Sequence, residues 1–253
     1  MSAQSLALPR VLDAHALGSV LVVAPHPDDE SMGCGGLMAL LRTRRIPVFV
    51  LLLSDGEMSH PGSRAWSPAA RAALRRLEFT QALAALNLEP QAMLALGLPD
   101  GALPGCEEPG FAAAVTAVER CMRSHPHQTL LVPWRRDPHA DHRAGSAIAR
   151  AANAGLTHPM RVLEYGVWMA ERGSADDLPC DGEAIHWQLD IRAVVERKLA
   201  ALAAHRSQCG DAIFDDPLGF TLPLAMRMRC ADPREVFFEV TAAALAPSQA
   251  LRS

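Results

Sequence analysis

The stretch that decides the fold covers residues 20–36 and has the sequence VLVVAPHPDDESMGCGG. Its opening apolar run is typical of a parallel β-strand that is covered on both faces. His26, Asp28 and Asp29 follow the run at once, and the glycines come directly after them. Because ligand sites in open α/β sheets lie at the carboxyl ends of the strands, we expect chemistry at this point.

A second polar group of the same kind lies far along the chain. The apolar run over residues 129–132 precedes His139-Ala140-Asp141-His142. Each group thus follows a short buried strand, and chance does not readily explain two such placements in one chain. We therefore predict that the fold brings the two groups together around one metal ion.

The rest of the chain alternates short apolar runs with segments of helical periodicity. We predict strands over residues 19–24, 47–53, 91–96 and 128–133, and helices over 33–45, 68–87, 111–123 and 143–153. In the helix over 68–87 we expect Leu74 and Leu77 on the buried face, and Arg75 and Glu78 more exposed. Strands that alternate with helices imply βαβ units, so the fold class is α/β with a mostly parallel sheet.

Beyond residue 155 the alternation is looser. We expect strands over 161–169 and 184–189, a helix over 191–206 and an edge strand over 235–240. With no repeat or low-complexity segment, the simplest organisation is a single domain over 1–253. Residues 1–18 are then a lead-in that could hold one helical turn, and residues 156–253 extend the same sheet.

Composition argues against several classes of protein. The net charge of −4 and the absence of a basic surplus disfavour nucleic acid as a partner. The longest apolar run, residues 47–53, is too short to span a membrane, and the N-terminus lacks the pattern of a secretory signal. The six cysteines are scattered without a C-x-x-C pair, which favours reduced thiols and a cytoplasmic location. A homo-oligomer is compatible with all of this.

His26, Asp29 and His142 form a candidate metal-binding set. Catalytic zinc takes three protein ligands and leaves one position open for water, and these residues supply nitrogen, oxygen and nitrogen. The spacing of His26 and Asp29 lets both point at one centre from a tight turn. Asp28 then lies beside the metal, where its carboxylate can accept a proton from metal-bound water as a general base.

His139 and Asp141 complete the candidate catalytic group. A protonated His139 beside the metal would stabilise a developing oxyanion or protonate a leaving amine. Asp141 either forms a hydrogen bond with His139 and raises its pKa, or orients another side chain of the site. Together these residues favour metal-assisted hydrolysis of an amide.

Other interpretations of the same residues stay open. Either motif alone could be turn or helix-cap chemistry, because Pro and Asp are common in both. A set of two histidines and one carboxylate also suits Fe²⁺, including iron(II) oxygenases. The glycines over residues 33–36 could cradle a phosphate in a non-catalytic nucleotide- or sugar-binding module, although they match no established phosphate-binding pattern.

At these residues the sequence resembles the PIG-L/LmbE-like family of zinc-dependent N-acetyl-sugar deacetylases. The resemblance rests on Ala24-Pro25-His26-Pro27-Asp28-Asp29-Glu30 with Gly33, Gly35 and Gly36, and on His139-x-Asp141-His142. Supporting matches are Leu53-Ser54-Asp55-Gly56-Glu57, Arg75-x-x-Glu78, Leu98-Pro99-Asp100-Gly101, and the segment from Lys198 through His205-x-Ser207-Gln208.

The resemblance implies a Rossmann-like three-layer αβα sandwich and a zinc ion held by His26, Asp29 and His142. It also implies that Asp28 is the general base and that His139 is its electrostatic or acid partner. The implied substrate is a small N-acetylated sugar or glycoconjugate.

Substrate contacts are expected from loops above the same strand ends. The candidates are Glu57 and Arg64 in the loop over 54–66, Asp100 after the third strand, and His205 near the late helix. The other histidines outside the two motifs, such as His60, carry no partner pattern, and we expect most of them at the surface or in loops.

Overall fold

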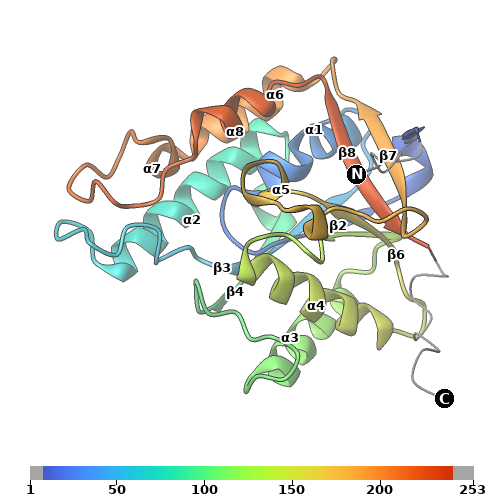
Figure 1. Cartoon of the computed structure of the whole chain (residues 1–253), viewed down its shortest axis with the longest axis horizontal. Helices are drawn as coiled ribbons and strands as arrows, with labels where there is room; N and C mark the ends of the chain where they lie inside the picture. Colours follow the sequence, from blue (N-terminus) through green and yellow to red (C-terminus); the bar gives the residue numbers. More distant parts are fainter. Residues whose placement is uncertain (1–7, 242–253) are drawn as a thin grey trace.

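The computed structural model describes residues 8–241. Their strands form one eight-stranded sheet in the order β1-β7-β8-β6-β5-β2-β3-β4. Figure 1 shows the sheet with helices on both of its sides. Neighbouring strands are parallel, except that β8 runs antiparallel to both β6 and β7. The α/β class with a mostly parallel sheet is confirmed. The strands are β1 Arg10–Val11, β2 Val20–Ala24, β3 Val48–Ser54, β4 Met93–Leu98, β5 Thr129–Pro133, β6 Arg161–Tyr165, β7 Ala184–Asp190 and β8 Arg234–Val240.

Helices cover both faces of the sheet and complete the predicted three layers. Helices α1, α2 and α6 pack together on one face, and α3 and α4 pack together on the other. The helices are α1 Asp29–Thr43, α2 Pro68–Ala85, α3 Phe111–Ser124, α4 Ala140–Ala154, α5 Met169–Arg172, α6 Val195–Ala204, α7 Arg206–Cys209 and α8 Leu224–Arg229, with short 3₁₀ turns at Ala14–Leu17, Pro90–Ala92 and Ala175–Asp177. The first of these 3₁₀ turns lies in the lead-in, where the sequence suggests a helical turn.

Strand β2 lies at the centre of the sheet and explains the uniform apolar run. Val20 and Val22 pack into the core on one face, whereas Leu21 and Val23 pack into the core on the other. After β2 the chain moves outward through β3 and β4, and it then crosses back to β5 on the other side of β2. The carboxyl ends of β2 and β5 therefore flank a topological switch point, which is where open α/β sheets bind ligands.

The glycines that follow β2 serve close packing. A Cβ atom on Gly33 would lie 2.1 Å from the ring of Tyr165, and one on Gly36 would lie 2.5 Å from Ile191. The backbone N–H groups of Gly36 and of the next residue both donate to the buried carboxylate of Glu235, at 2.7 Å each. These two N–H groups already have an acceptor, which argues against a phosphate cradle at this point.

Both helices next to the switch point begin earlier than the sequence pattern predicts. Helix α1 starts at Asp29 and α4 starts at Ala140, so polar residues that we place before the helices lie in their first turns. Negative side chains are stabilised at helix N-termini, which accounts for Asp29 and Asp141 in these positions. The predicted edge strand over 235–240 is also misplaced, because β8 lies between β7 and β6.

Helix α2 begins as predicted, with the Ser67 hydroxyl accepting the backbone N–H of Ala70 at 3.2 Å. Its buried face differs from the prediction. Arg75 and Glu78 are each 3% exposed, whereas Leu77 is 56% exposed. The charged face points inward because it meets the polar groups beside β2, an arrangement that hydrophobic periodicity does not reveal.

Two further observations concern the cysteines and the length of the helices. All six cysteines are free thiols, and three of them are buried. Within residues 8–241, no helix has the length and apolar character needed to cross a membrane.

Candidate active site

A cavity of about 210 Å³ opens at the switch point between β2 and β5. Its walls come from the turn after β2, the loop after β3, the loop after β4, the start of α4, and the segments around α5 and before α8. Its lining residues are His26, Asp28, Asp29, Met32, Met58, Ser59, Arg75, Asp100, Gly101, His139, Trp168, Arg172 and Phe220.

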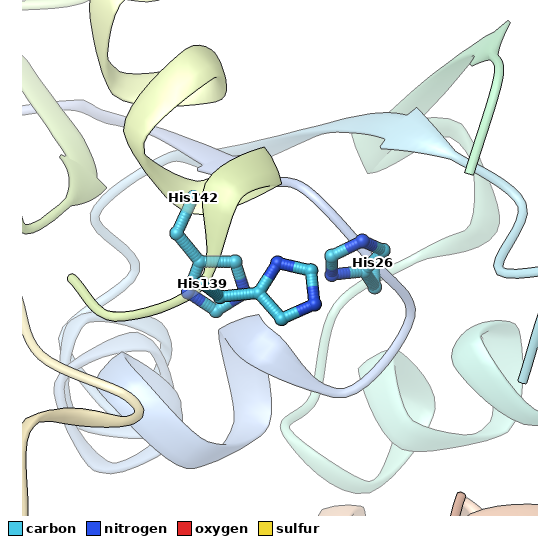
Figure 2. Close-up of side chains that lie close together, drawn as sticks. All are labelled: His26, His139 and His142. Carbon is cyan, nitrogen blue, oxygen red and sulfur yellow. The ribbon is translucent and has the colours of Figure 1, made fainter. Parts of the chain in front are cut away.

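His26, Asp29 and His142 meet beside this cavity, as predicted. The Asp29 carboxylate lies between the two imidazoles, with Oδ2 3.2 Å from Nδ1 of His26 and Oδ1 3.2 Å from Nε2 of His142. The ring of His139 lies 4.9 Å from that of His26 and 4.8 Å from that of His142, so three imidazoles converge (Figure 2). The two sequence motifs are therefore parts of one site.

The residues present fit a metal ion. His142 is fully buried, and neither of its ring nitrogens makes a hydrogen bond within residues 8–241, although each lies 3.2 Å from a carboxylate oxygen. Burial lowers the pKa of His142, but Asp29 and Asp137 outweigh it and raise that pKa to about 9. Burial raises the pKa of Asp29, yet His142 and His26 hold it well below its usual range. The site thus favours positive charge at its centre, which a cation supplies.

Two donor sets have ligand atoms that all lie within 4.8 Å of one another: His26, His139 and His142, and His26, Asp100 and Asp141. The predicted set of His26, Asp29 and His142 is not one of these two, although each oxygen of Asp29 lies 3.2 Å from a nitrogen of one of the imidazoles. All three sets contain His26, so the position of a bound metal ion would distinguish them.

Asp141 orients His26. Its Oδ2 lies 3.0 Å from Nε2 of His26, and its two oxygens accept the backbone N–H groups of Gly101 and Leu103 at 2.8 and 3.1 Å. The hydrogen bond that we considered between its carboxylate and His139 is absent, because only the backbone N–H of Asp141 reaches that ring. The orienting role is the one that the geometry supports.

The residue that orients His142 is missing from the sequence-based set. It is Asp137, a fully buried side chain whose Oδ1 lies 3.2 Å from Nδ1 of His142. The same carboxylate accepts backbone N–H groups from His139, Val167 and Trp168 at 3.0 to 3.2 Å. Asp137 lies in the sequence between the end of β5 and His139. This position could have suggested its role, since carboxylates commonly orient metal-binding imidazoles.

Asp28 is held in a strained backbone conformation beside the metal set. Its φ is 129°, which is rare for a residue other than glycine. Its Oδ2 lies 3.2 Å from the guanidinium of Arg75. Burial raises the pKa of Asp28 to about 7, although Arg75 opposes the shift. A carboxylate that titrates near neutral pH suits proton transfer.

His139 caps helix α4 and faces the cavity. Its Nδ1 accepts the backbone N–H of Asp141 at 3.2 Å, so the ring proton is assigned to Nε2. Burial lowers the pKa of His139 to about 4, with His142 and His26 adding to the effect. The predicted protonated imidazole is therefore not favoured here, and a neutral ring that donates from Nε2 takes its place.

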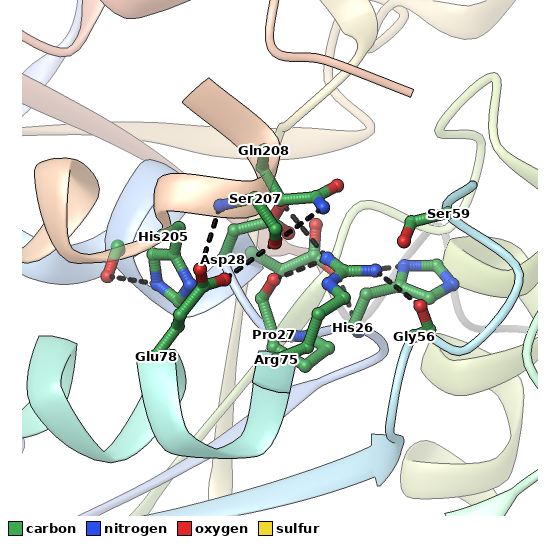
Figure 3. Close-up of polar contacts among 12 residues, drawn as sticks. His26, Pro27, Asp28, Gly56, Ser59, Arg75, Glu78, His205, Ser207 and Gln208 are labelled. Carbon is green, nitrogen blue, oxygen red and sulfur yellow. Dashed lines mark hydrogen bonds and ion pairs between the residues drawn. The ribbon is translucent and has the colours of Figure 1, made fainter. Parts of the chain in front are cut away.

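Arg75 and Glu78 form a polar support behind Asp28 (Figure 3). Arg75 donates to the backbone carbonyls of Pro27 and Gly56 at 2.6 and 3.1 Å. Glu78 accepts the backbone N–H and the hydroxyl of Ser207 in α7 at 2.8 and 2.6 Å. This support explains why the inner face of α2 is charged.

His205 belongs to the same support and not to the substrate cavity. It is fully buried, and its Nε2 lies 3.3 Å from Oε1 of Glu30. The other oxygen of Glu30 accepts the backbone N–H of Asp28 at 3.1 Å. A fully buried ring cannot contact substrate, so the prediction for His205 is corrected. His60 is also fully buried, contrary to expectation.

Of the remaining substrate candidates, only Asp100 lines the cavity, whereas Glu57 and Arg64 do not. Asp100 lines the cavity, with Oδ1 3.2 Å from Nε2 of His26. Glu57 lies outside the lining and accepts the backbone N–H of Asp100 at 3.1 Å, so it supports that loop. Arg64 is exposed, and its backbone N–H donates to Asp215. The structure does not bring Arg64 to the cavity, because the loop turns it toward solvent.

Sequence comparison defines the class of the protein. The model of the PIG-L family, described as GlcNAc-PI de-N-acetylase, matches residues 21–153, which include every residue of both motifs. The chain belongs to this family.

Among similar proteins is a probable N-acetyl-α-D-glucosaminyl L-malate deacetylase 2 from Bacillus subtilis, 30% identical over 75% of this chain and 82% of the relative. A 1D-myo-inositol 2-acetamido-2-deoxy-α-D-glucopyranoside deacetylase from Nocardia farcinica is 26% identical over 85% of this chain and 71% of the relative. The crystal structure of a conserved protein from Thermus thermophilus has a TM-score of 0.64 at 25% identity, over 94% of this chain and 100% of that one.

Proposed function

We propose that this protein is a metal-dependent amide hydrolase that removes the acetyl group from the nitrogen of an amino sugar or amino-sugar conjugate. The observation that carries the proposal is the position of Asp29 between His26 and His142, with a second carboxylate, Asp28, beside it in the same cavity. Family membership supports this chemistry, as do two relatives that are named as deacetylases of N-acetylated amino-sugar conjugates.

The proposed ligands of the ion are His26, Asp29 and His142, and the proposed ion is Zn²⁺. Catalytic zinc commonly has three nitrogen and oxygen ligands from the protein. The same donors bind Fe²⁺, so a metal analysis has to measure both. When bound, the ion lowers the pKa of a water molecule and polarises the amide carbonyl.

Asp28 and His139 carry the proton transfers in this proposal. The Asp28 carboxylate takes a proton from the water that attacks the acetyl carbon. It then returns a proton to the nitrogen as the C–N bond breaks, which gives acetate and a free amine. His139 donates its Nε2–H to the carbonyl oxygen, where negative charge develops. Arg75 and Glu30 hold Asp28 in position from behind.

The direct test combines a metal assay with an acetate assay. Protein purified without chelator is expected to contain about one zinc or iron ion per chain. It is also expected to release acetate from N-acetylated amino sugars, and chelation should abolish the release. Absence of metal would contradict the proposal. Oxygen consumption without acetate release would favour the iron(II) oxygenase, and binding without turnover would favour a non-catalytic module.

A further inference from the structure

The mouth of the cavity carries a cation that none of the roles above explains. Two of the lining residues are arginines, Arg75 and Arg172. Arg75 is 3% exposed, and its charge is balanced by Asp28. Arg172 ends α5, is exposed to solvent and forms no ion pair with any residue between 8 and 241. It is therefore available to a ligand in the cavity.

Arg172 is held in place by an aromatic side chain. Its guanidinium carbon lies 4.0 Å from the ring centroid of Trp168, a cation–π contact that limits where the charge can go. Trp168 is 4% exposed, and its ring lies 5.5 Å from that of Phe220 and 6.5 Å from that of His139. The cation thus lies on the same wall of the cavity as the proposed oxyanion donor.

This wall is also tied to the proposed metal set through the backbone. The Trp168 N–H donates to Oδ2 of Asp137 at 3.0 Å, and Oδ1 of the same carboxylate lies 3.2 Å from His142. One buried carboxylate therefore fixes both the imidazole at the floor and the ring that carries Arg172. The distance between floor and cation is consequently set by the fold.

The two ends of the cavity would hold different parts of the substrate. The proposed hydrolysis places the acetamide at the floor, beside Asp28, Asp29 and His139, whereas Arg172 lies at the mouth on an aromatic support. A guanidinium pairs bidentately with carboxylates and phosphates. An acetamide at the floor and an anion at the mouth is the orientation that this arrangement favours.

We infer that the substrate carries an anionic group, a carboxylate or a phosphate, and that Arg172 on the face of Trp168 selects it. This inference rests on the proposed deacetylation and names the substrate class for the same cavity. Arg172 acts on recognition and not on the chemical step, so its contribution lies in KM. The effect weakens as salt rises, because an exposed charge is screened.

The test measures acetate release from three compounds that share the acetamido sugar. Methyl N-acetylglucosaminide is neutral, its 6-phosphate carries a phosphate, and N-acetylmuramic acid carries a carboxylate. The enzymes are the native protein, Arg172→Gln, Arg172→Lys and the control Arg197→Gln. Arg197 is an exposed arginine of α6 outside the cavity lining, so its replacement removes the same charge elsewhere.

The native protein is expected to prefer at least one anionic compound over the neutral one by roughly five- to tenfold in kcat/KM. Arg172→Gln should lose that preference because its KM for the anionic compounds rises. Arg172→Lys should retain part of the preference, and Arg197→Gln should retain all of it. Whether phosphate or carboxylate is favoured identifies the anion.

Equal use of neutral and anionic compounds by the native protein, with no effect of Arg172→Gln, would overturn the inference while the deacetylation stands. A preference that survives in Arg172→Gln would assign selection to another residue and would also overturn it. Absence of acetate from all three compounds would overturn the deacetylation together with the inference.

Discussion

The floor and the mouth of the cavity are built in opposite ways. The floor consists of side chains from strand ends and from the first turns of α1 and α4, and its central members are almost inaccessible: His142 is fully buried and Asp29 is 2% exposed. The mouth consists of exposed side chains from loops and from the short helix α5, such as Arg172 and Met58, of which Met58 is 49% exposed. A rigid floor suits chemistry that needs fixed geometry, whereas loop side chains can vary and so set the substrate.

The supporting contacts of the two regions also differ, because those of the floor are buried and those near the mouth are exposed. Each floor imidazole proposed as a ligand has a second carboxylate behind it, Asp141 for His26 and Asp137 for His142. Next to the mouth, the loop over 62–65, which follows the lining residues Met58 and Ser59, is held to the segment before α8 chiefly by Asp215. This exposed carboxylate accepts two backbone N–H groups and the Ser63 hydroxyl. Substitutions should therefore cost catalysis at the floor and affinity at the mouth.

The largest effect is expected from Asp29→Ala. Removal of the carboxylate between His26 and His142 should abolish metal binding and lower kcat/KM by roughly a thousandfold or more. Metal content by mass spectrometry and acetate release check this. Because Asp29 is buried, circular dichroism has to confirm that the variant folds, and Asp29→Asn serves as the less disruptive version. An Asp29→Ala protein that keeps both metal and turnover would remove Asp29 from the metal set.

Asp28→Asn should distinguish the role of the general base from the role of a metal ligand. The amide has the shape of the carboxylate but cannot accept the proton, so kcat should fall by about 10²- to 10⁴-fold while the metal content stays at its native value. The steady-state rate of acetate release gives kcat, and metal analysis of the same sample gives the metal content. If this variant lost metal as completely as Asp29→Ala, the division of roles between the two aspartates would be wrong.

Among the floor residues, His139→Ala is expected to have a smaller effect on activity than the two aspartate variants. Loss of the Nε2–H donor should lower kcat by roughly a hundredfold, with metal content and KM little changed. His139→Gln, which retains a side-chain N–H donor, should recover part of the rate. Loss of metal in His139→Ala would instead support the donor set in which His139 is a ligand.

The smallest effect is expected from Asp215→Ala, which acts on the loops next to the mouth. Loss of the carboxylate that joins the two loops should raise KM by about threefold, the size of a weak exposed contact, and leave kcat and metal content unchanged. Asp181→Ala is the control, since Asp181 is also exposed but lies in the segment before β7, apart from both of these loops. A fall in kcat without a change in KM would show that floor and mouth are not separable in this way.

The same contrast explains how much could be predicted from sequence. The floor follows from local rules: apolar runs place β2 and β5, and the polar residues after each strand end meet because parallel strands end at one edge. His26, Asp28, Asp29, His139 and His142 come together for this reason. The family resemblance adds their proposed roles and the three-layer fold.

The parts that sequence reasoning missed depend on tertiary contacts without a local signal. Trp168 and Arg172 line the cavity on the segment after β6, whose backbone N–H groups at Val167 and Trp168 donate to Asp137. Arg75 points inward because carbonyls of distant loops accept its hydrogen bonds, against the hydrophobic pattern of α2. His205 resembles a substrate ligand in sequence, yet Glu30 lies against it in a buried network.

The most direct test of the account is the position of the metal in a crystal of the zinc-loaded protein. Anomalous scattering at the zinc absorption edge should give one peak between His26, Asp29 and His142, with Asp28 and His139 adjacent but not bound. A peak among His26, Asp100 and Asp141, or one with His139 as a ligand in place of Asp29, would contradict the account.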